Sequence, residues 1–231
     1  MKKDDNIAGL SILINLALSL GKILAGIATS SVSIIASGIH SGLDLMASIL
    51  AFYSASQSAK PADDEHQYGH GKYQNVTAVA EALFIIVAVI IIFKKALPTI
   101  MQGKSTILHS ELGIAVMGIA AIISFSTSAV LASAYHRTMQ EAFWENHRHL
   151  MVNGAASAVV CLGLAAVRFT GLNIIDPILA LLITLLLLRE GYRHLKKSVG
   201  GIFDVRLSPE EERIIREVLS EHRKRFVQYH A

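Results

Sequence analysis

Six apolar runs of about 20 residues or more, separated by short polar stretches, follow one another along the 231-residue chain. A helix of about 20 apolar residues crosses a hydrocarbon core of about 30 Å. Only 17% of the residues are charged, against about 25% in ordinary soluble proteins. The sequence therefore predicts an all-α integral membrane protein of the cell membrane, a multi-pass bundle of six transmembrane helices. The expected spans are Ile7–Thr29, Val32–Tyr53, Asn75–Ile100, Leu112–His136, His149–Thr170 and Asp176–Leu195.

The basic residues between these runs predict how the helices are oriented. Lys and Arg concentrate in cytoplasmic loops, and here one side of the expected bundle is richer in them. That side carries Lys2, Lys3, Lys60, Lys72, Arg137, Arg148, Arg193, Lys196 and Lys197, and the other carries Lys94, Lys95, Lys104 and Arg168. We therefore expect the N and C termini to be cytoplasmic.

Two parts of the chain differ in composition. Residues 1–205 hold the apolar runs and form the expected six-helix transmembrane domain. Residues 206–231 are polar, and Ser208, Pro209 and Glu211 have the spacing of a capped helix start. We expect a cytoplasmic C-terminal helix there. The net charge of +3, with no basic tract among aromatic residues, gives no indication of a nucleic-acid partner.

Two histidine–carboxylate pairs lie inside or next to the expected spans. His40 and Asp44 are four residues apart, and so are Glu145 and His149. This spacing places both members of a pair on one helix face. Ionisable groups at membrane depth are costly unless they are paired or bind something. Four such ligands from two helices are the number and type that a tetrahedral divalent metal site needs.

Other roles for neighbouring residues remain open. A histidine in a membrane often only forms a hydrogen bond between helices. Glu145 is alternatively a surface residue, in which case Asn153, one turn beyond His149, is the candidate fourth ligand. Glu81 is either a proton relay or part of an internal pair. Asp176 precedes a proline and is expected to cap its own helix.

Several segments resemble the cation diffusion facilitator family. The residues that carry the likeness are LALSLGKILAGIATSSVSIIASGIHSGLDL, the loop DDEHQYGHGKYQN, and NGAASAVVCLGL followed by DPILALLITLLLL. The resemblance implies six spans, a homodimer, and proton-coupled export of a divalent transition metal from the cytosol. It also implies a ferredoxin-like carboxy-terminal domain, of which we expect only the first helix here.

The resemblance also assigns residues, with one departure. It implies a second metal site in the loop, formed by Asp63, His66 and His70, although such a loop is alternatively a solvated acidic turn. In span five the family usually has a histidine followed by an aspartate. Here the order is reversed and the acid is Glu145, followed by His149.

The expected substrate is a divalent cation, with Zn the most common in the family and Fe, Co, Ni and Mn also suited to histidine and carboxylate ligands. Histidines must be neutral to bind metal, so binding releases protons. Unperturbed imidazole titrates near pH 6.5, and a modest pH difference therefore changes occupancy. We do not expect an enzyme, because protein ligands fill the inner site. The alternatives are a non-transporting metal-binding or sensor subunit and, with less support, an intramembrane metalloenzyme.

Overall fold

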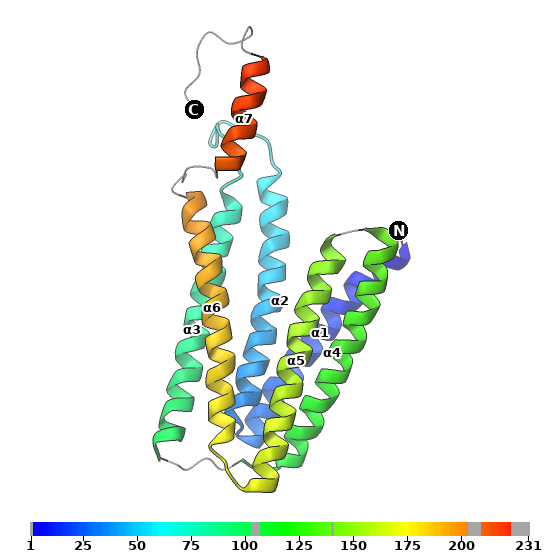
Figure 1. Cartoon of the computed structure of the whole chain (residues 1–231), viewed down its shortest axis with the longest axis vertical. Helices are drawn as coiled ribbons and strands as arrows, with labels where there is room; N and C mark the ends of the chain where they lie inside the picture. The colour runs from blue at the N-terminus through cyan, green and yellow to red at the C-terminus, as the bar shows by residue number, and fades with distance from the viewer. Residues whose placement is uncertain (1, 103–106, 140, 203–208, 223–231) are drawn as a thin grey trace.

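The computed structural model describes residues 2–102, 107–139, 141–202 and 209–222. These residues form helices and no strand, as the sequence predicts. Six long helices run side by side, and a short α7 stands beyond one end of the bundle (Figure 1). The helices are α1 (Lys2–Thr29), α2 (Val32–Ser58), α3 (Tyr73–Gln102), α4 (Ser110–Thr138), α5 (Glu141–Thr170), α6 (Ile175–Ile202) and α7 (Pro209–Glu221). The expected helix beginning at Pro209 is present, whereas Ser208 lies outside the described residues.

Within the described ranges, five helices are long and apolar enough to cross a membrane, namely α1 to α5. The 28-residue α6 is equally long, but charged residues flank a shorter apolar stretch between Asp176 and Arg189. By length and composition α6 is therefore not among the helices that qualify. The six-span arrangement stays a prediction for this helix.

The outer surface of the bundle is apolar. Leu24, Leu162 and Phe52, for example, are 67%, 71% and 80% exposed. Burying an apolar side chain of this size typically contributes about 1.5–3 kcal/mol, so leaving many exposed to water is unfavourable. An apolar exterior around a core in which many small residues, Ala and Ser, are buried beside larger apolar ones is the arrangement expected of helices that pack in lipid.

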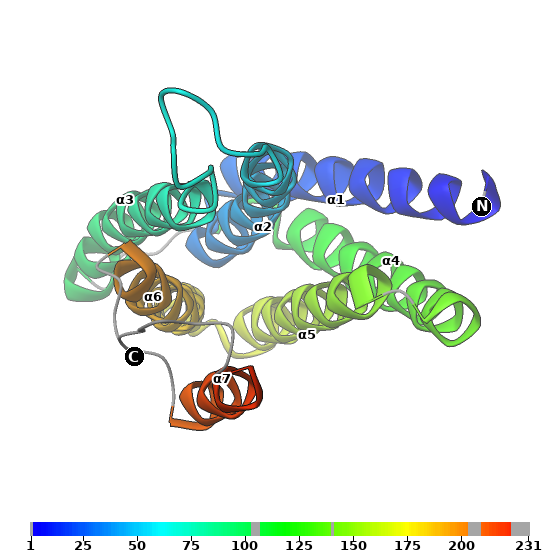
Figure 2. The same ribbon diagram turned by 90° about the horizontal axis from the view of Figure 1, so that it is seen from above.

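Helix α2 lies at the centre of the arrangement. It packs against α1, α3, α5 and α6, while α4 pairs with α5 and α3 pairs with α6. Figures 1 and 2 show α4 and α5 leaning away from α3 and α6 toward the end that carries α7. A polar residue on α2 is therefore within reach of several neighbouring helices.

Glycines allow α1 and α2 to pack closely. A Cβ atom on Gly38 would lie 2.9 Å from the backbone nitrogen of Ile23, and one on Gly26 would lie 2.8 Å from that of Ile35. Real Cβ atoms essentially never come so close to a neighbouring backbone. The two glycines thus fix the tight hairpin that positions the buried part of α2.

Asp176 holds α2 and α6 together at one end of the bundle. It lies in the first turn of α6 and is completely buried. Its carboxylate accepts hydrogen bonds from the backbone nitrogens of Val32 (2.8 Å) and Ser33 (3.2 Å) and from the hydroxyl of Ser31. Asp176 therefore caps α2, and the expectation that it caps its own helix is wrong. The sequence could not reveal this, because the contact joins residues more than 140 positions apart.

Candidate metal site

His40 and Asp44 lie one turn apart on α2, inside the bundle. The Nδ1 atom of His40 is 3.7 Å from Oδ1 of Asp44. The side chain of His40 is only 6% exposed, and that of Asp44 is 19% exposed. Nδ1 of His40 is buried without a hydrogen-bond partner. Buried polar atoms normally have a partner, and an orphaned one requires an explanation such as an ion that belongs there.

A third ionisable group comes from α6. His40, Asp44 and Glu190 each offer a nitrogen or oxygen atom, and these atoms lie within 4.8 Å of one another. The packing of α6 against α2 brings Glu190 to this place. The sequence prediction did not single out Glu190. The available signal was an acid inside the sixth expected span, two residues beyond the end of its apolar run at Leu188.

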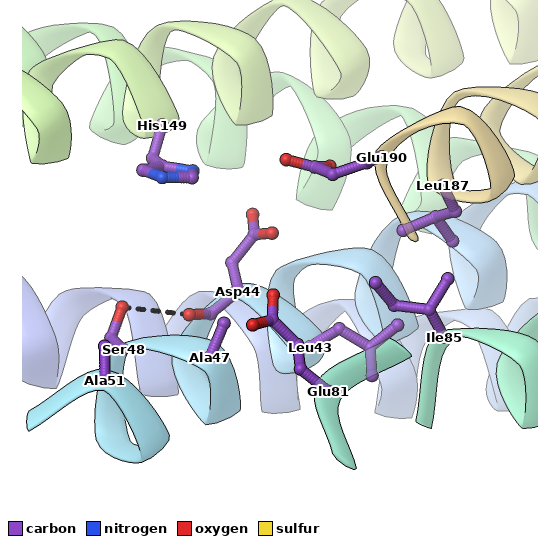
Figure 3. Close-up of a pocket in the computed structure, with 10 residues that line it drawn as sticks. All are labelled: Leu43, Asp44, Ala47, Ser48, Ala51, Glu81, Ile85, His149, Leu187 and Glu190. Carbon is purple, nitrogen blue, oxygen red and sulfur yellow. Dashed lines mark hydrogen bonds between the residues drawn. The ribbon is translucent and has the colours of Figure 1, made fainter. Parts of the chain in front are cut away.

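A cavity of about 200 Å³ adjoins this cluster. Figure 3 shows Asp44, Glu190 and His149 directed toward a common space, with Glu81 facing the same space from α3. The remaining wall is mostly apolar and comes from α2, α3 and α6. Three carboxylates and one imidazole thus border a small cavity between helices, which is chemistry suited to a cation.

Asn153 on α5 connects the cluster to a buried cation on α1. Its Nδ2 atom donates to Oδ2 of Asp44 at 2.8 Å, and its Oδ1 atom accepts from the hydroxyl of Ser41 at 3.4 Å. The ammonium group of Lys22 donates to the same Ser41 hydroxyl at 3.0 Å. Lys22 is 1% exposed. These contacts fix one oxygen of Asp44 and leave the other near His40.

Replacement of Asn153 by Ala is expected to weaken metal binding by about tenfold, because residues that orient a ligand typically contribute about 10–100-fold to metal affinity. The loss comes from freeing the carboxylate of Asp44 to rotate. Competition between the purified protein and a metal-chelating dye measures the effect. Ser48→Ala is the matched control, since the Ser48 hydroxyl donates only to the backbone carbonyl of Asp44. Equal affinity in the Asn153 and Ser48 variants would contradict this role.

The structure separates the two members of the predicted pair on α5. His149 lines the cavity with Asp44 and Glu190, although it is outside the three-residue cluster. Glu145 instead lies on the surface, 61% exposed, with its carboxylate 3.6 Å from the guanidinium of Arg148. Of the four predicted inner ligands, the structure thus brings Asp44 and His149 to this cavity and His40 to the cluster beside Asp44. It leaves Glu145 on the surface.

The loop between α2 and α3 brings its three predicted residues together. Asp63 lies 3.4 Å from Nδ1 of His66 and 3.5 Å from Nε2 of His70. The two imidazole rings are 4.4 Å apart between centroids. His70 is buried, and its Nδ1 atom has no hydrogen-bond partner. One carboxylate and two imidazoles form a compact group that is able to hold a divalent cation.

The local backbone shapes this loop. Asp63 accepts hydrogen bonds from the backbone nitrogens of His66 (2.7 Å) and Glu65 (3.1 Å). The bond from the backbone of His66, supported by the nearby His70, lowers the pKa of Asp63 below its ordinary value. Gly69 has a φ of +80°, which other residues rarely adopt. The loop thus keeps a carboxylate ionised next to two histidines.

The fold and the two groups of nitrogen and oxygen ligands define a helical membrane protein equipped to handle cations. The sequence matches the model of the cation efflux transmembrane domain over residues 9–202. The chain therefore belongs to the cation efflux family, the cation diffusion facilitators. This is a family of transporters and not of enzymes, which confirms the resemblance and the prediction that the chain is no enzyme.

Similar proteins support this assignment. An uncharacterized transporter, sll1263, of Synechocystis sp. is 28% identical over 202 residues, covering 87% of this chain and 65% of the relative. The cation-efflux pump FieF of Salmonella agona is 32% identical over 202 residues, covering 85% and 65%. FieF of Klebsiella pneumoniae is 30% identical over 201 residues, with the same coverage. The chain spans about 65% of the length of these relatives.

Proposed function

We propose that the chain exports a divalent transition-metal cation from the cytosol in exchange for protons, and that His40 and Asp44 on α2 form the centre of the transport site. The observation that carries this proposal is the buried, unpartnered Nδ1 atom of His40 beside a carboxylate inside the helical bundle. Two of the similar proteins, the FieF proteins, are cation-efflux pumps, which agrees with this proposal. Zn is the first candidate substrate, with Fe, Co, Ni and Mn as the others.

Charge balance explains why carboxylates and histidines suit this task. A dication alone in a medium of low dielectric is strongly disfavoured. Carboxylates cancel its charge, while neutral imidazoles supply further bonds without adding charge. Protons and the metal compete for the same atoms, because a histidine nitrogen that holds a proton cannot bind the ion. This competition couples metal release to proton uptake.

Two cavities, one lined by Asp44 and Glu190 and the other by His40, indicate the side from which the ion enters. The cavity with the carboxylates lies along Leu43–Ala51 of α2, toward the end that carries loop 59–72. A second cavity of about 260 Å³ is lined by His40 and lies along residues 152–160 of α5 and 179–186 of α6, toward the opposite end. Its lining is otherwise apolar. A cation reaches the site through the first cavity, and we infer a state open toward the loop end, the proposed cytoplasmic side.

The proposed arrangement in the cell membrane has six spans, cytoplasmic termini and a homodimeric assembly. We count α6 as the sixth span because Asp176, at one end of its apolar stretch, is completely buried and hydrogen-bonded by α2. Its charge therefore faces no lipid. The orientation rests on the excess of basic residues at the loop end, and the homodimer rests on the family resemblance.

Proteoliposomes that contain the protein and a metal-sensitive dye test this proposal. An imposed pH difference is expected to drive Zn²⁺ across the membrane, and the flux is expected to collapse when an ionophore removes the difference. Binding of Zn²⁺ without any flux would overturn the transport function and favour a metal-binding or sensor subunit.

In this proposal, Asp63, His66 and His70 gather the cation at the cytoplasmic mouth. Replacement of His70 by Ala is expected to raise the metal concentration needed for half-maximal flux severalfold while leaving the maximal rate nearly unchanged. The reason is that the loop site raises the local metal concentration but lies outside the transport site. Dye-based flux at increasing Zn²⁺ concentrations measures both quantities.

Asp64→Asn is the control for the loop experiment, since it also removes an exposed acid near the mouth. If both variants change the flux equally, the loop acts through its general charge and not as a metal site.

A further inference from the structure

We propose that Glu190 of α6 is a direct ligand of the transported cation and takes the position that the sequence pattern gives to Glu145. The inference rests on the proposed function and assigns one of its ligands. The set of two histidines and two carboxylates is kept, but it is now drawn from α2, α5 and α6.

Geometry is the first support. A carboxylate oxygen of Glu190 lies with the ligand atoms of His40 and Asp44 inside a group no wider than 4.8 Å. An ion at the centre of such a group needs only small side-chain movements to reach bonding distances near 2.0–2.2 Å. Figure 3 shows Glu190 extending from α6 toward Asp44 and His149.

The second support is the imidazole of His40. Nδ1 of His40 is buried and has no hydrogen-bond partner, although the side chain is only 6% exposed. Oδ1 of Asp44 lies 3.7 Å from this nitrogen, beyond hydrogen-bond distance. A bound cation satisfies the nitrogen and joins it to the two carboxylates.

The surroundings of Glu145 explain why Glu190, and not Glu145, takes this ligand position. Its carboxylate is exposed and paired with Arg148 at 3.6 Å. It precedes His149 by four residues, which corresponds to about 6 Å along a helix axis at 1.5 Å per residue. His149 already lies at the edge of the cavity and outside the cluster. Glu145 is thus one further turn from the ion, whereas Glu190 faces it.

Glu81 is the third acid on the cavity wall, after Asp44 and Glu190, but it is a weaker candidate ligand than Glu190. It lines the cavity from α3 and is absent from the group of ligand atoms within 4.8 Å. We therefore assign the second carboxylate ligand to Glu190.

A Co²⁺ titration of the full chain in detergent tests this inference. The visible absorption bands of Co²⁺ report the identity and geometry of its ligands. All variants carry His70→Ala so that the loop site does not contribute. Glu190→Gln is expected to weaken Co²⁺ binding by about tenfold or more and to change the bands, in keeping with the effects of disturbing metal ligation. Glu145→Gln, the matched control, is expected to leave affinity and spectrum unchanged.

The other outcomes distinguish failure of the Glu190 assignment from failure of the proposed transport site. If Glu190→Gln binds like the parent protein, or if Glu145→Gln is the variant that loses binding, the assignment of Glu190 is overturned. If Asp44→Asn also binds normally, the proposed transport site itself fails. Should Glu190→Gln not elute as a folded protein, Glu190→Asp replaces it. This shorter acid is expected to bind Co²⁺ with an altered spectrum, and an unaltered spectrum would overturn the assignment.

Discussion

Asp44→Asn is expected to abolish proton-driven metal flux in proteoliposomes. The substitution keeps the size of the side chain and its contact with Asn153 at 2.8 Å, but it removes the charge next to His40. A dication held by a neutral amide in place of a carboxylate loses charge compensation in a medium where that compensation is essential. We expect flux at the level of empty liposomes, measured with a metal-sensitive dye under an imposed pH difference.

Two further measurements make this result specific. Ser48→Ala, a change in the same cavity that leaves every carboxylate in place, is expected to transport normally. Asp44→Glu retains the charge and is expected to restore part of the flux. Normal transport by Asp44→Asn would remove Asp44 from the site and end the proposed mechanism.

Asp176→Ala is expected to be the most destabilising single change at the opposite end of the bundle. It removes an acceptor that satisfies two backbone nitrogens and the Ser31 hydroxyl, all at buried positions. Hydrogen bonds to charged groups contribute about 1.5–3 kcal/mol each, and leaving a buried donor unsatisfied costs about 1–3 kcal/mol. We therefore expect a loss of several kcal/mol, seen as a lower melting temperature in detergent.

Glu111→Gln is the control for this experiment. Glu111 forms an ion pair with Arg168, and both side chains are substantially exposed. Exposed ion pairs contribute only about 0–1 kcal/mol, so this variant is expected to melt close to the parent protein. If Asp176→Ala and Glu111→Gln melt at the same temperature, the carboxylate of Asp176 does not hold α2 and α6 together.

The local sequence pattern was sufficient to predict the helices and the proximity of His40 and Asp44 on α2. Long apolar runs can satisfy their backbone only as helices in lipid, so their existence and approximate limits follow from the sequence alone. Spacing by four residues places His40 and Asp44 on one face, and the structure has them 3.7 Å apart. The loop group of Asp63, His66 and His70 was predicted from the family resemblance, and the structure has Asp63 and His70 3.5 Å apart.

The partners of α2 could not be predicted, because they depend on how helices distant in the sequence pack and rotate. Spacing places Glu145 and His149 on one face of α5 but does not say which turn of that face reaches α2. The structure brings Asn153 to Asp44 and leaves Glu145 with Arg148. Glu190 was missed for the same reason, since nothing in α6 itself indicates that it packs beside His40.

The buried cap formed by Asp176 has a consequence for movement. It binds the first turn of α6 to the start of α2, so these two helices cannot slide past each other at that end without breaking several hydrogen bonds. Any separation between them must be a tilt that pivots there and grows along both helices. His40 lies nearer the pivot than Asp44 and Glu190, so a small angular change displaces the two acids more than the imidazole.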